Sequence, residues 1–177
     1  MSVAVRSVEN PFDVLGLPAR FALDPAELER RFRDVQRAVH PDRHAHAAPA
    51  VRRAALSGAV SASQAYRTLR DELARGEALL AVLGAPATAP KADPALLMEM
   101  MTLRESLEEA RGDARRIGAL HAEVERSRTS ALDALGAAFD AGDLPRAAAL
   151  LARLRYHRRF LDEVAALEDE GAPPPAR

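Results

Sequence analysis

The spacing of the apolar residues constrains the fold of this chain more than any other feature, because that spacing has the period of a helix almost throughout. No stretch alternates apolar with polar residues as a half-buried strand would, and β-branched or aromatic residues rarely cluster. Alanine, leucine, arginine and glutamate, which favour helices, dominate the 177 residues. We therefore expect an all-α fold.

Capping residues and prolines mark the helices of the first half. Asn10 and Asp24 are predicted N-caps, and a proline follows each at the first helical position. They begin a short helix that ends before Gly16 and a second helix that ends near His40, because the next proline disfavours helical geometry there. A third helix is expected over 49–69. Its candidate packing residues are Ala54, Val60, Ala65, Tyr66 and Leu69.

The second helix has two contrasting faces. Its predicted buried stripe consists of Leu28, Phe32, Val35 and Val39. Arg30, Arg33 and Arg37 lie on the opposite side, which we expect to face water. A solvated face is the usual explanation of such a charged stripe, so a binding function requires a second feature beside it.

The loop His40-Pro41-Asp42-Arg43 supplies that second feature. Four features follow one another along the chain in this order: FDVLGL, a basic helix, HPDR and SASQAYRTLRD. Together they resemble the J-domain of DnaJ-type co-chaperones over about the first seventy residues. The resemblance implies that this loop docks on the ATPase domain of an HscA/DnaK-type heat-shock chaperone and stimulates its ATP hydrolysis. The implied chaperone-binding residues are His40, Pro41, Asp42, Arg30, Arg33, Arg37 and Arg43.

The chemistry of this loop suits docking and offers no catalysis. Proline stiffens the loop and lowers the entropy lost on binding, and an exposed carboxylate accepts charge-assisted hydrogen bonds from a partner. The hydrolysed ATP belongs to the partner, so we expect no enzymatic activity and no cofactor. A hydrolase using the loop histidines would also need an adjacent serine, cysteine or second carboxylate, and none stands beside them.

A metal site is a competing hypothesis for the same loop, because His40, His44 and His46 lie within seven residues. A structural zinc site usually needs four ligands, and the surrounding alanines supply none. We therefore expect no metal. His121 and His157 are single helical histidines, for which ordinary packing or surface positions are expected.

The second half reads as a separate helical domain. The proline- and alanine-rich stretch APATAPKADP follows a helix that ends at Gly84, and three helical patterns come after it, at about 94–110, 113–141 and 144–168. Short connections favour an antiparallel three-helix bundle. The expected divisions are a J-domain with its following helix at 10–84, a linker at 85–93, the bundle at 94–169 and a disordered tail at 170–177.

The first bundle helix carries more apolar residues than one face needs. A complete core stripe is formed by Leu96, Met100, Leu103, Leu107 and Ala110. A separate sector, formed by Leu97, Met98 and Met101, continues into Glu105, Glu108 and Glu109. Two explanations remain open, a wide burial face or a partner-binding surface. In the last helix the predicted core stripe is Ala147, Leu150, Leu154, Leu161 and Val164, with Tyr156 well off it.

A J-domain followed by LLMEMMTLRESLEE resembles the HscB family, co-chaperones of iron–sulfur cluster assembly, from about Asn10 to Glu168. In that family the bundle binds the scaffold protein IscU and the J-domain delivers it to HscA. By position, the implied scaffold-binding residues are Leu97, Met98, Met101, Glu105, Glu109 and Tyr156. Compared with that family, Thr102 stands where a glutamate is frequent and Met101 where a leucine is usual, which makes the surface slightly less acidic and more flexible. A J-domain adaptor for a different client protein is the alternative.

The amino-acid composition limits the kinds of partner that we expect this chain to bind. The 25 lysines and arginines nearly balance 26 aspartates and glutamates, so no global basic field attracts nucleic acid or an anionic membrane. Cysteine is absent, which excludes disulfides and thiolate ligands and suits a reducing cytoplasm. The beginning of the sequence lacks a signal-peptide pattern, and the most apolar run is too short to span a bilayer. We expect a cytoplasmic protein without membrane or nucleic-acid partners.

Overall fold

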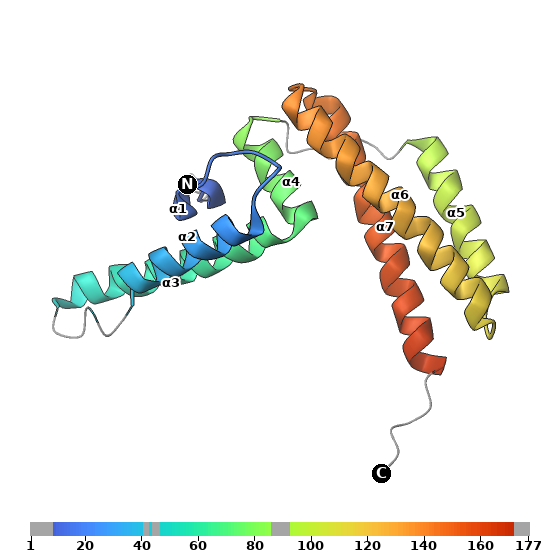
Figure 1. Cartoon of the computed structure of the whole chain (residues 1–177), viewed down its shortest axis with the longest axis horizontal. Helices are drawn as coiled ribbons and strands as arrows, with labels where there is room; N and C mark the ends of the chain where they lie inside the picture. The colour runs from blue at the N-terminus through green and yellow to red at the C-terminus, as the bar shows by residue number, and fades with distance from the viewer. Residues whose placement is uncertain (1–8, 41–42, 44–46, 86–92, 172–177) are drawn as a thin grey trace, which may run out of the picture. The chain divides into compact units, whose positions relative to one another are not determined.

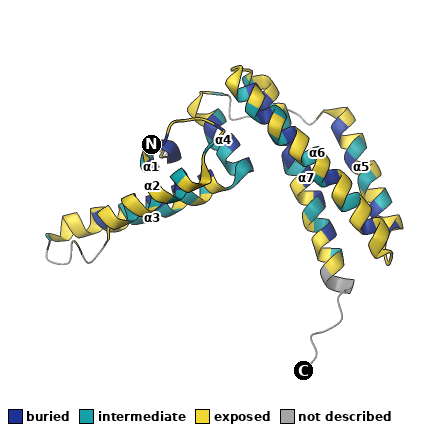
Figure 2. Ribbon diagram, viewed as in Figure 1, coloured by how far each residue is buried: buried dark blue, intermediate teal, exposed yellow. Residues whose placement is uncertain are grey.

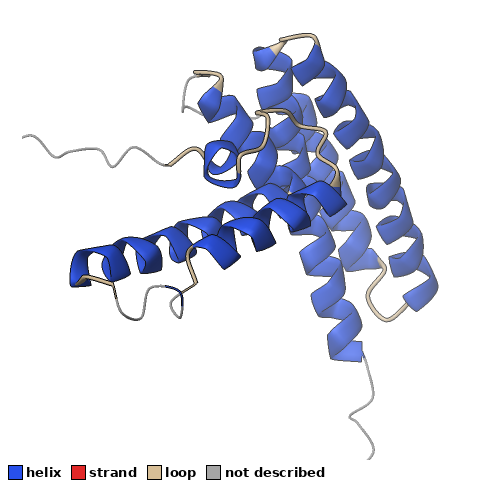
Figure 3. Cartoon of the chain, turned by 60° about the vertical axis from the view of Figure 1, so that its left-hand side comes forward, coloured by secondary structure: helices blue, strands red, loops and turns tan. Residues whose placement is uncertain are grey.

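The computed structural model describes residues 9–40, 43, 47–85 and 93–171, and every regular element in these ranges is an α-helix (Figure 3). The all-α expectation is therefore confirmed. The chain divides into two compact units, residues 1–85 and 86–177.

The first unit is a helical hairpin flanked by two shorter helices. The long helices α2 and α3 lie side by side, and α1 and α4 pack against α3 (Figure 1). The helices are α1 at Pro11–Leu15, α2 at Pro25–Ala38, α3 at Pro49–Arg70 and α4 at Glu72–Val82.

The predicted caps of the first unit are present. Oδ1 of Asn10 accepts a 3.0 Å hydrogen bond from the backbone N–H of Phe12, and Oδ1 of Asp24 accepts one of the same length from Ala26. The carboxylate of Asp24 thus satisfies a donor that the first turn of α2 leaves unpaired. Gly16 ends α1 with a φ of 61°, a left-handed conformation that glycine adopts without steric cost.

The core of the first unit confirms part of the sequence prediction and corrects part of it. Its largest fully buried side chains are Phe12, Leu15, Leu69 and Leu79. The α2 stripe is at least half-buried, with Leu28 its most buried member. The predictions for Ala54 and Val60 were wrong, because both side chains are exposed.

The error at Val60 is one of helical phase. The buried residues of α3 are Ala55, Ala62, Ala65 and Leu69, spaced by seven, three and four residues. At about 100° per residue, Val60 lies almost opposite this stripe. Small alanines make up most of the buried face of α3, so the larger valine did not mark the core.

The second unit is a three-helix bundle made of α5 at Pro94–Glu109, α6 at Ala114–Asp140 and α7 at Leu144–Gly171 (Figure 1). Helices α6 and α7 share the most extensive contact, whereas α5 packs more lightly against both. Leu96, Met100 and Leu107 are buried as predicted, and Leu103 is half-buried. Buried side chains thus line the sides of the helices that face one another (Figure 2).

Helix α7 buries a wider face than its predicted stripe. Leu150 and Leu161 are only half-buried, whereas Leu151 and Phe160, which lie to either side of the predicted stripe, are almost inaccessible. The prediction for α7 was therefore partly wrong. The physical reason is that α7 contacts both α5 and α6, so two adjacent sectors of its surface are covered.

Candidate functional site

The arginine stripe of α2 lies in water as predicted. The side chains of Arg30, Arg33 and Arg37 are 66%, 70% and 75% exposed. Each also pairs with a carboxylate three or four residues away on the same helix. In order, these partners are Glu27 at 3.5 Å, Glu29 at 2.9 Å, and Asp34.

Tyr66 of α3 joins this stripe to the hairpin. Its ring stacks on Phe32 with centroids 4.3 Å apart, and its hydroxyl donates a 2.5 Å hydrogen bond to Oε2 of Glu29. The hydrogen bond from Tyr66, followed by the one from Arg33, lowers the pKa of Glu29 below its ordinary value. The same bond raises the pKa of Tyr66. Tyr66 was among the predicted packing residues of α3, but no local pattern indicates this polar contact across 37 residues.

The turn after α2 is described only in part. Its described residues, His40 and Arg43, are both exposed, and the backbone N–H of Arg43 donates to the His40 carbonyl at 3.1 Å. Nη1 of Arg43 also donates to the carbonyl of Arg37 at 3.3 Å, which satisfies an acceptor near the end of α2. Pro41, Asp42, and the histidines 44 and 46 of the metal hypothesis lie outside the described residues.

The described members of the predicted chaperone-binding set lie together. One open depression along α2 is lined by all five, and we call these residues the α2 surface: Arg30, Arg33, Arg37, His40 and Arg43. Within the described ranges, no group of three or more histidines, aspartates and glutamates is arranged to hold a metal ion.

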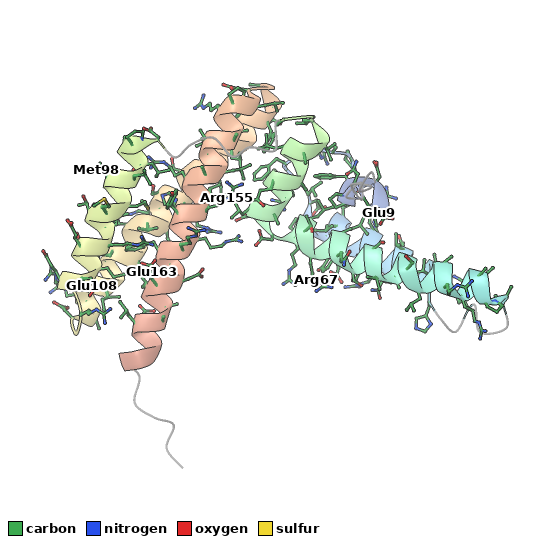
Figure 4. The ribbon with its side chains drawn as sticks, turned by 180° about the vertical axis from the view of Figure 1, so that it is seen from behind. Glu9, Arg67, Met98, Glu108, Arg155 and Glu163 are labelled. Atoms are coloured by element: carbon green, nitrogen blue, oxygen red, sulfur yellow. The ribbon has the colours of Figure 1, made fainter. Side chains whose placement is uncertain are left out.

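The second sector of α5 is exposed. Leu97, Met98 and Met101 are 41%, 64% and 58% accessible, so burial in the bundle core does not explain them. Figure 4 shows Met98 on the side of α5 that points away from α6 and α7. Glu105 and Glu109 are exposed on the same helix. We call these five residues the α5 surface.

Tyr156 lies on α7 near the edge of α5. It is half-buried, and its phenol is within electrostatic range of Arg104 on α5. The pKa of Arg104 is raised chiefly by its hydrogen bond to Glu163, with Tyr156 as the smallest contributor.

His157 takes the packing position that is one of the two expected for it, and it is a buried titratable group. Its side chain is fully buried in α7, its Nε2 lies 3.4 Å from Oγ of Ser127, and its Nδ1 has no hydrogen-bond partner among the described residues. Desolvation lowers its pKa, and the positive charge of Arg153 lowers it further. Its position three residues after Leu154 and four before Leu161 places it on the predicted core stripe of α7, so helical periodicity alone indicated its burial.

The helices of the described ranges include none that is long and apolar enough to cross a lipid bilayer.

Comparison with known proteins decides the family. Residues 92–165 match the family model described as the HSCB C-terminal oligomerisation domain. The "Co-chaperone protein HscB homolog" of Burkholderia multivorans is 41% identical over 164 residues, covering 89% of this chain and 93% of that protein. This chain belongs to the HscB co-chaperone family.

Other members of the HscB family agree in sequence and fold. The HscB homologue of Bordetella parapertussis is 37% identical over 166 residues, covering 92% of this chain and 98% of its own. The structure of HscB from Vibrio cholerae matches with a TM-score of 0.81 and 33% identity, over 91% of this chain and 98% of that one. The crystal structure of human HscB matches with a TM-score of 0.82 and 25% identity, over 94% of this chain and 84% of that one. This HscB-family chain therefore has a J-domain followed by a helical bundle, and its relatives are co-chaperones, which suggests a non-enzymatic protein.

Proposed function

We propose that this co-chaperone stimulates the ATPase of an HscA/DnaK-type heat-shock chaperone and delivers an IscU-type iron–sulfur scaffold to it, which promotes cluster maturation and transfer. The observation that carries the proposal is the exposed apolar group on α5. Leu97, Met98 and Met101 stand on a helix that already buries a complete core stripe. Exposed apolar side chains gathered on one helix face are typical of a binding surface.

The α2 surface is the part that would meet the chaperone. Three of its arginines, Arg30, Arg33 and Arg37, form exposed ion pairs within α2, and such pairs contribute little to stability. An acidic partner surface can therefore replace Glu27, Glu29 and Asp34 at low cost. The attraction between opposite charges raises the association rate more than the affinity. In the proposal, His40, Pro41 and Asp42 then contact the ATPase domain.

The α5 surface is the part that would meet the scaffold. Two of its three apolar residues are methionines, whose flexible side chains adapt to a partner. Glu105 and Glu109 add negative charge on the same helix, and Tyr156 adds an aromatic edge from α7. This combination suits a partner with an apolar centre and a basic rim. Because the chain contains no cysteine, it supplies no thiolate ligand, and in the proposal the cluster stays on the scaffold as cargo.

Two measurements on the full chain test the proposal. Isothermal titration with purified IscU should give binding that Leu97→Ala weakens and that Leu83→Ala leaves unchanged. Leu83 is the matched control, because it is the same residue type with 46% exposure but belongs to the other unit. Steady-state ATP hydrolysis by the chaperone should rise when the co-chaperone is added. Absence of IscU binding together with normal ATPase stimulation would instead support a J-domain adaptor for a different client.

A further inference from the structure

Helix α5 presents the apolar residues of the proposed scaffold site, yet it is the most lightly packed helix of the bundle. Apolar packing through Leu96, Met100 and Leu107 holds it against its neighbours. Such contacts are not directional, so they restrain rotation and sliding of a helix less than paired hydrogen bonds do. The orientation of α5 therefore depends on its polar contacts.

Two ion pairs join α5 to α7, and each is made of two hydrogen bonds. Nη1 and Nη2 of Arg153 donate to the two carboxylate oxygens of Glu99 at 3.0 and 2.8 Å. Nε and Nη2 of Arg104 donate to the two carboxylate oxygens of Glu163 at 3.1 and 2.6 Å. We call these two pairs the α5–α7 clamps. Two parallel hydrogen bonds between a guanidinium and a carboxylate fix relative orientation as well as distance.

The clamps lie on opposite edges of the α5 core stripe. At about 100° per residue, Glu99 falls roughly 60° to one side of the centre of the stripe and Arg104 roughly 80° to the other. Rotation of α5 in either direction therefore lengthens one of the two pairs. Because the α5 surface begins just beyond the edge that carries Arg104, the same rotation would change how far Leu97 and Met101 project.

The charge order of the clamps also opposes sliding. Along α5 the acid Glu99 precedes the base Arg104, whereas along α7 the base Arg153 precedes the acid Glu163. A slip of α5 by one turn towards the start of α7, about 5.4 Å, would move Arg104 from Glu163 towards Arg159, a like charge. Electrostatic attraction thus favours a single register.

From this geometry we infer that Glu99, Arg104, Arg153 and Glu163 are positioning residues, which hold the α5 surface in the orientation that the scaffold binds. The inference rests on the proposed function, because it concerns the same surface. None of the four residues belongs to the α5 surface itself. They act by fixing the rotation and register of α5, so that binding requires no reordering of the helix.

The position of α5 can be measured without any partner. The chain has no cysteine, so nitroxide labels can be attached specifically to cysteines introduced at the exposed positions Thr102 of α5 and Glu123 of α6. Electron spin resonance then gives the distance distribution between the two labels. Glu99→Arg places two arginines together and should shift or broaden this distribution. The charge exchange Glu99→Arg with Arg153→Glu should restore it.

Scaffold affinity is measured on the unlabelled variants. Glu99→Arg should weaken IscU binding about threefold to tenfold, the range expected for coupled contacts, and the charge exchange should recover most of the loss. Glu125→Arg is the matched control. It breaks the Glu125–Arg128 pair within α6, whose 38% and 35% exposures equal those of Glu99 and Arg153. This control should leave IscU affinity unchanged.

The outcomes separate the inference from the proposed function. Label distances and affinity that are unchanged by Glu99→Arg would overturn the inference, and so would an affinity loss that the charge exchange does not recover. An equal loss in Glu125→Arg would show a general effect of charge on the bundle and would also overturn it. A wild-type chain that does not bind IscU would contradict the proposed function, and the label distances would still decide whether the clamps hold α5.

Discussion

The hydroxyl of Tyr66 in α3 donates a 2.5 Å hydrogen bond to Oε2 of Glu29 in α2, and Oε1 of the same carboxylate accepts from Nε of Arg33 at 2.9 Å. A single carboxylate thereby connects the packing of the hairpin to one arginine of the α2 surface. The stacking of Tyr66 on Phe32 holds the hydroxyl in place. The aromatic pair thus orients a charged group that we propose to face the chaperone.

Tyr66→Phe should raise the pKa of Glu29 towards its ordinary value of 4.5, because the largest cause of its depression is removed. A carboxylate with a lowered folded-state pKa stabilises the fold above its unfolded value, and that stabilisation is lost as the pH falls through the folded pKa. The variant should therefore lose less stability on acidification. Carboxyl NMR titration measures the shift. The pKa of Glu108, lowered by Arg111 in the other unit, should stay unchanged as a control.

His40→Gln should abolish stimulation of the chaperone ATPase while leaving the thermal midpoint nearly unchanged, because the side chain is exposed and contributes little to the core. The rate of ATP hydrolysis with saturating co-chaperone checks this. Stimulation at the wild-type level would contradict the role proposed for the loop.

Arg33→Glu and Arg37→Glu should weaken the same coupling, and the difference from wild type should shrink as salt is added. The side chains are 70% and 75% exposed, so their attraction to an acidic partner is screened over a Debye length of about 8 Å at physiological ionic strength. ATPase rates measured over a salt series test this. A loss that does not depend on salt would indicate damage to α2 instead.

Leu97→Ala and Met101→Ala should each cost on the order of 1 to 2 kcal/mol of affinity for IscU, the range in which interface hot spots begin. Both side chains are exposed, so truncation leaves no large cavity and the thermal midpoint should barely change. Tyr156→Ala should behave similarly, with a somewhat larger effect on stability because it is half-buried. Leu107→Ala is the contrasting variant, since this 3% exposed core residue should cost roughly 2 to 5 kcal/mol of stability.

The bundle should lose stability on acidification because of His157. Burial lowers its folded-state pKa below the ordinary 6.5, so the unfolded chain takes up a proton first as the pH falls. The free energy of unfolding should therefore decrease as the pH drops below about 6.5 and level off below the folded pKa. The charged groups around His157 have opposing effects on its pKa. Arg153 and Arg128 lower this pKa, whereas Glu99 and Glu125 raise it.

Denaturant unfolding between pH 5 and 8 measures this dependence. His157→Leu should remove this contribution to the pH dependence, whatever its effect on stability at a single pH, because leucine does not titrate. Replacement of His121, a half-buried histidine of α6, serves as the control, and this variant should retain the contribution of His157 to the pH dependence. An unchanged pH profile in His157→Leu would assign the acid sensitivity to other groups.

The amino-acid sequence by itself determined where several of the helices begin, whereas α7 extends to Gly171, beyond its predicted end. Asn10, Asp24 and Asp93 each accept a hydrogen bond from a backbone N–H two residues later, which is a contact that needs no other part of the chain. The core stripe and the second apolar sector of α5 were also predictable. Both follow from the period of one helix, whereas the exposure of Met98 was decided only by how the bundle packs.

Tertiary structure decided which face of a helix is covered when several faces are apolar. On α3, Ala55, Ala62 and Ala65 are buried and Val60 faces water, and on α7 the two neighbouring helices also bury Leu151 and Phe160, which lie off the predicted stripe. The polar contacts that orient both proposed surfaces could not be predicted from the sequence either. Tyr66 and Glu29 are 37 residues apart, and the α5–α7 clamps join residues 54 and 59 apart. Local periodicity extends over a few turns, whereas these pairings depend on how whole helices pack.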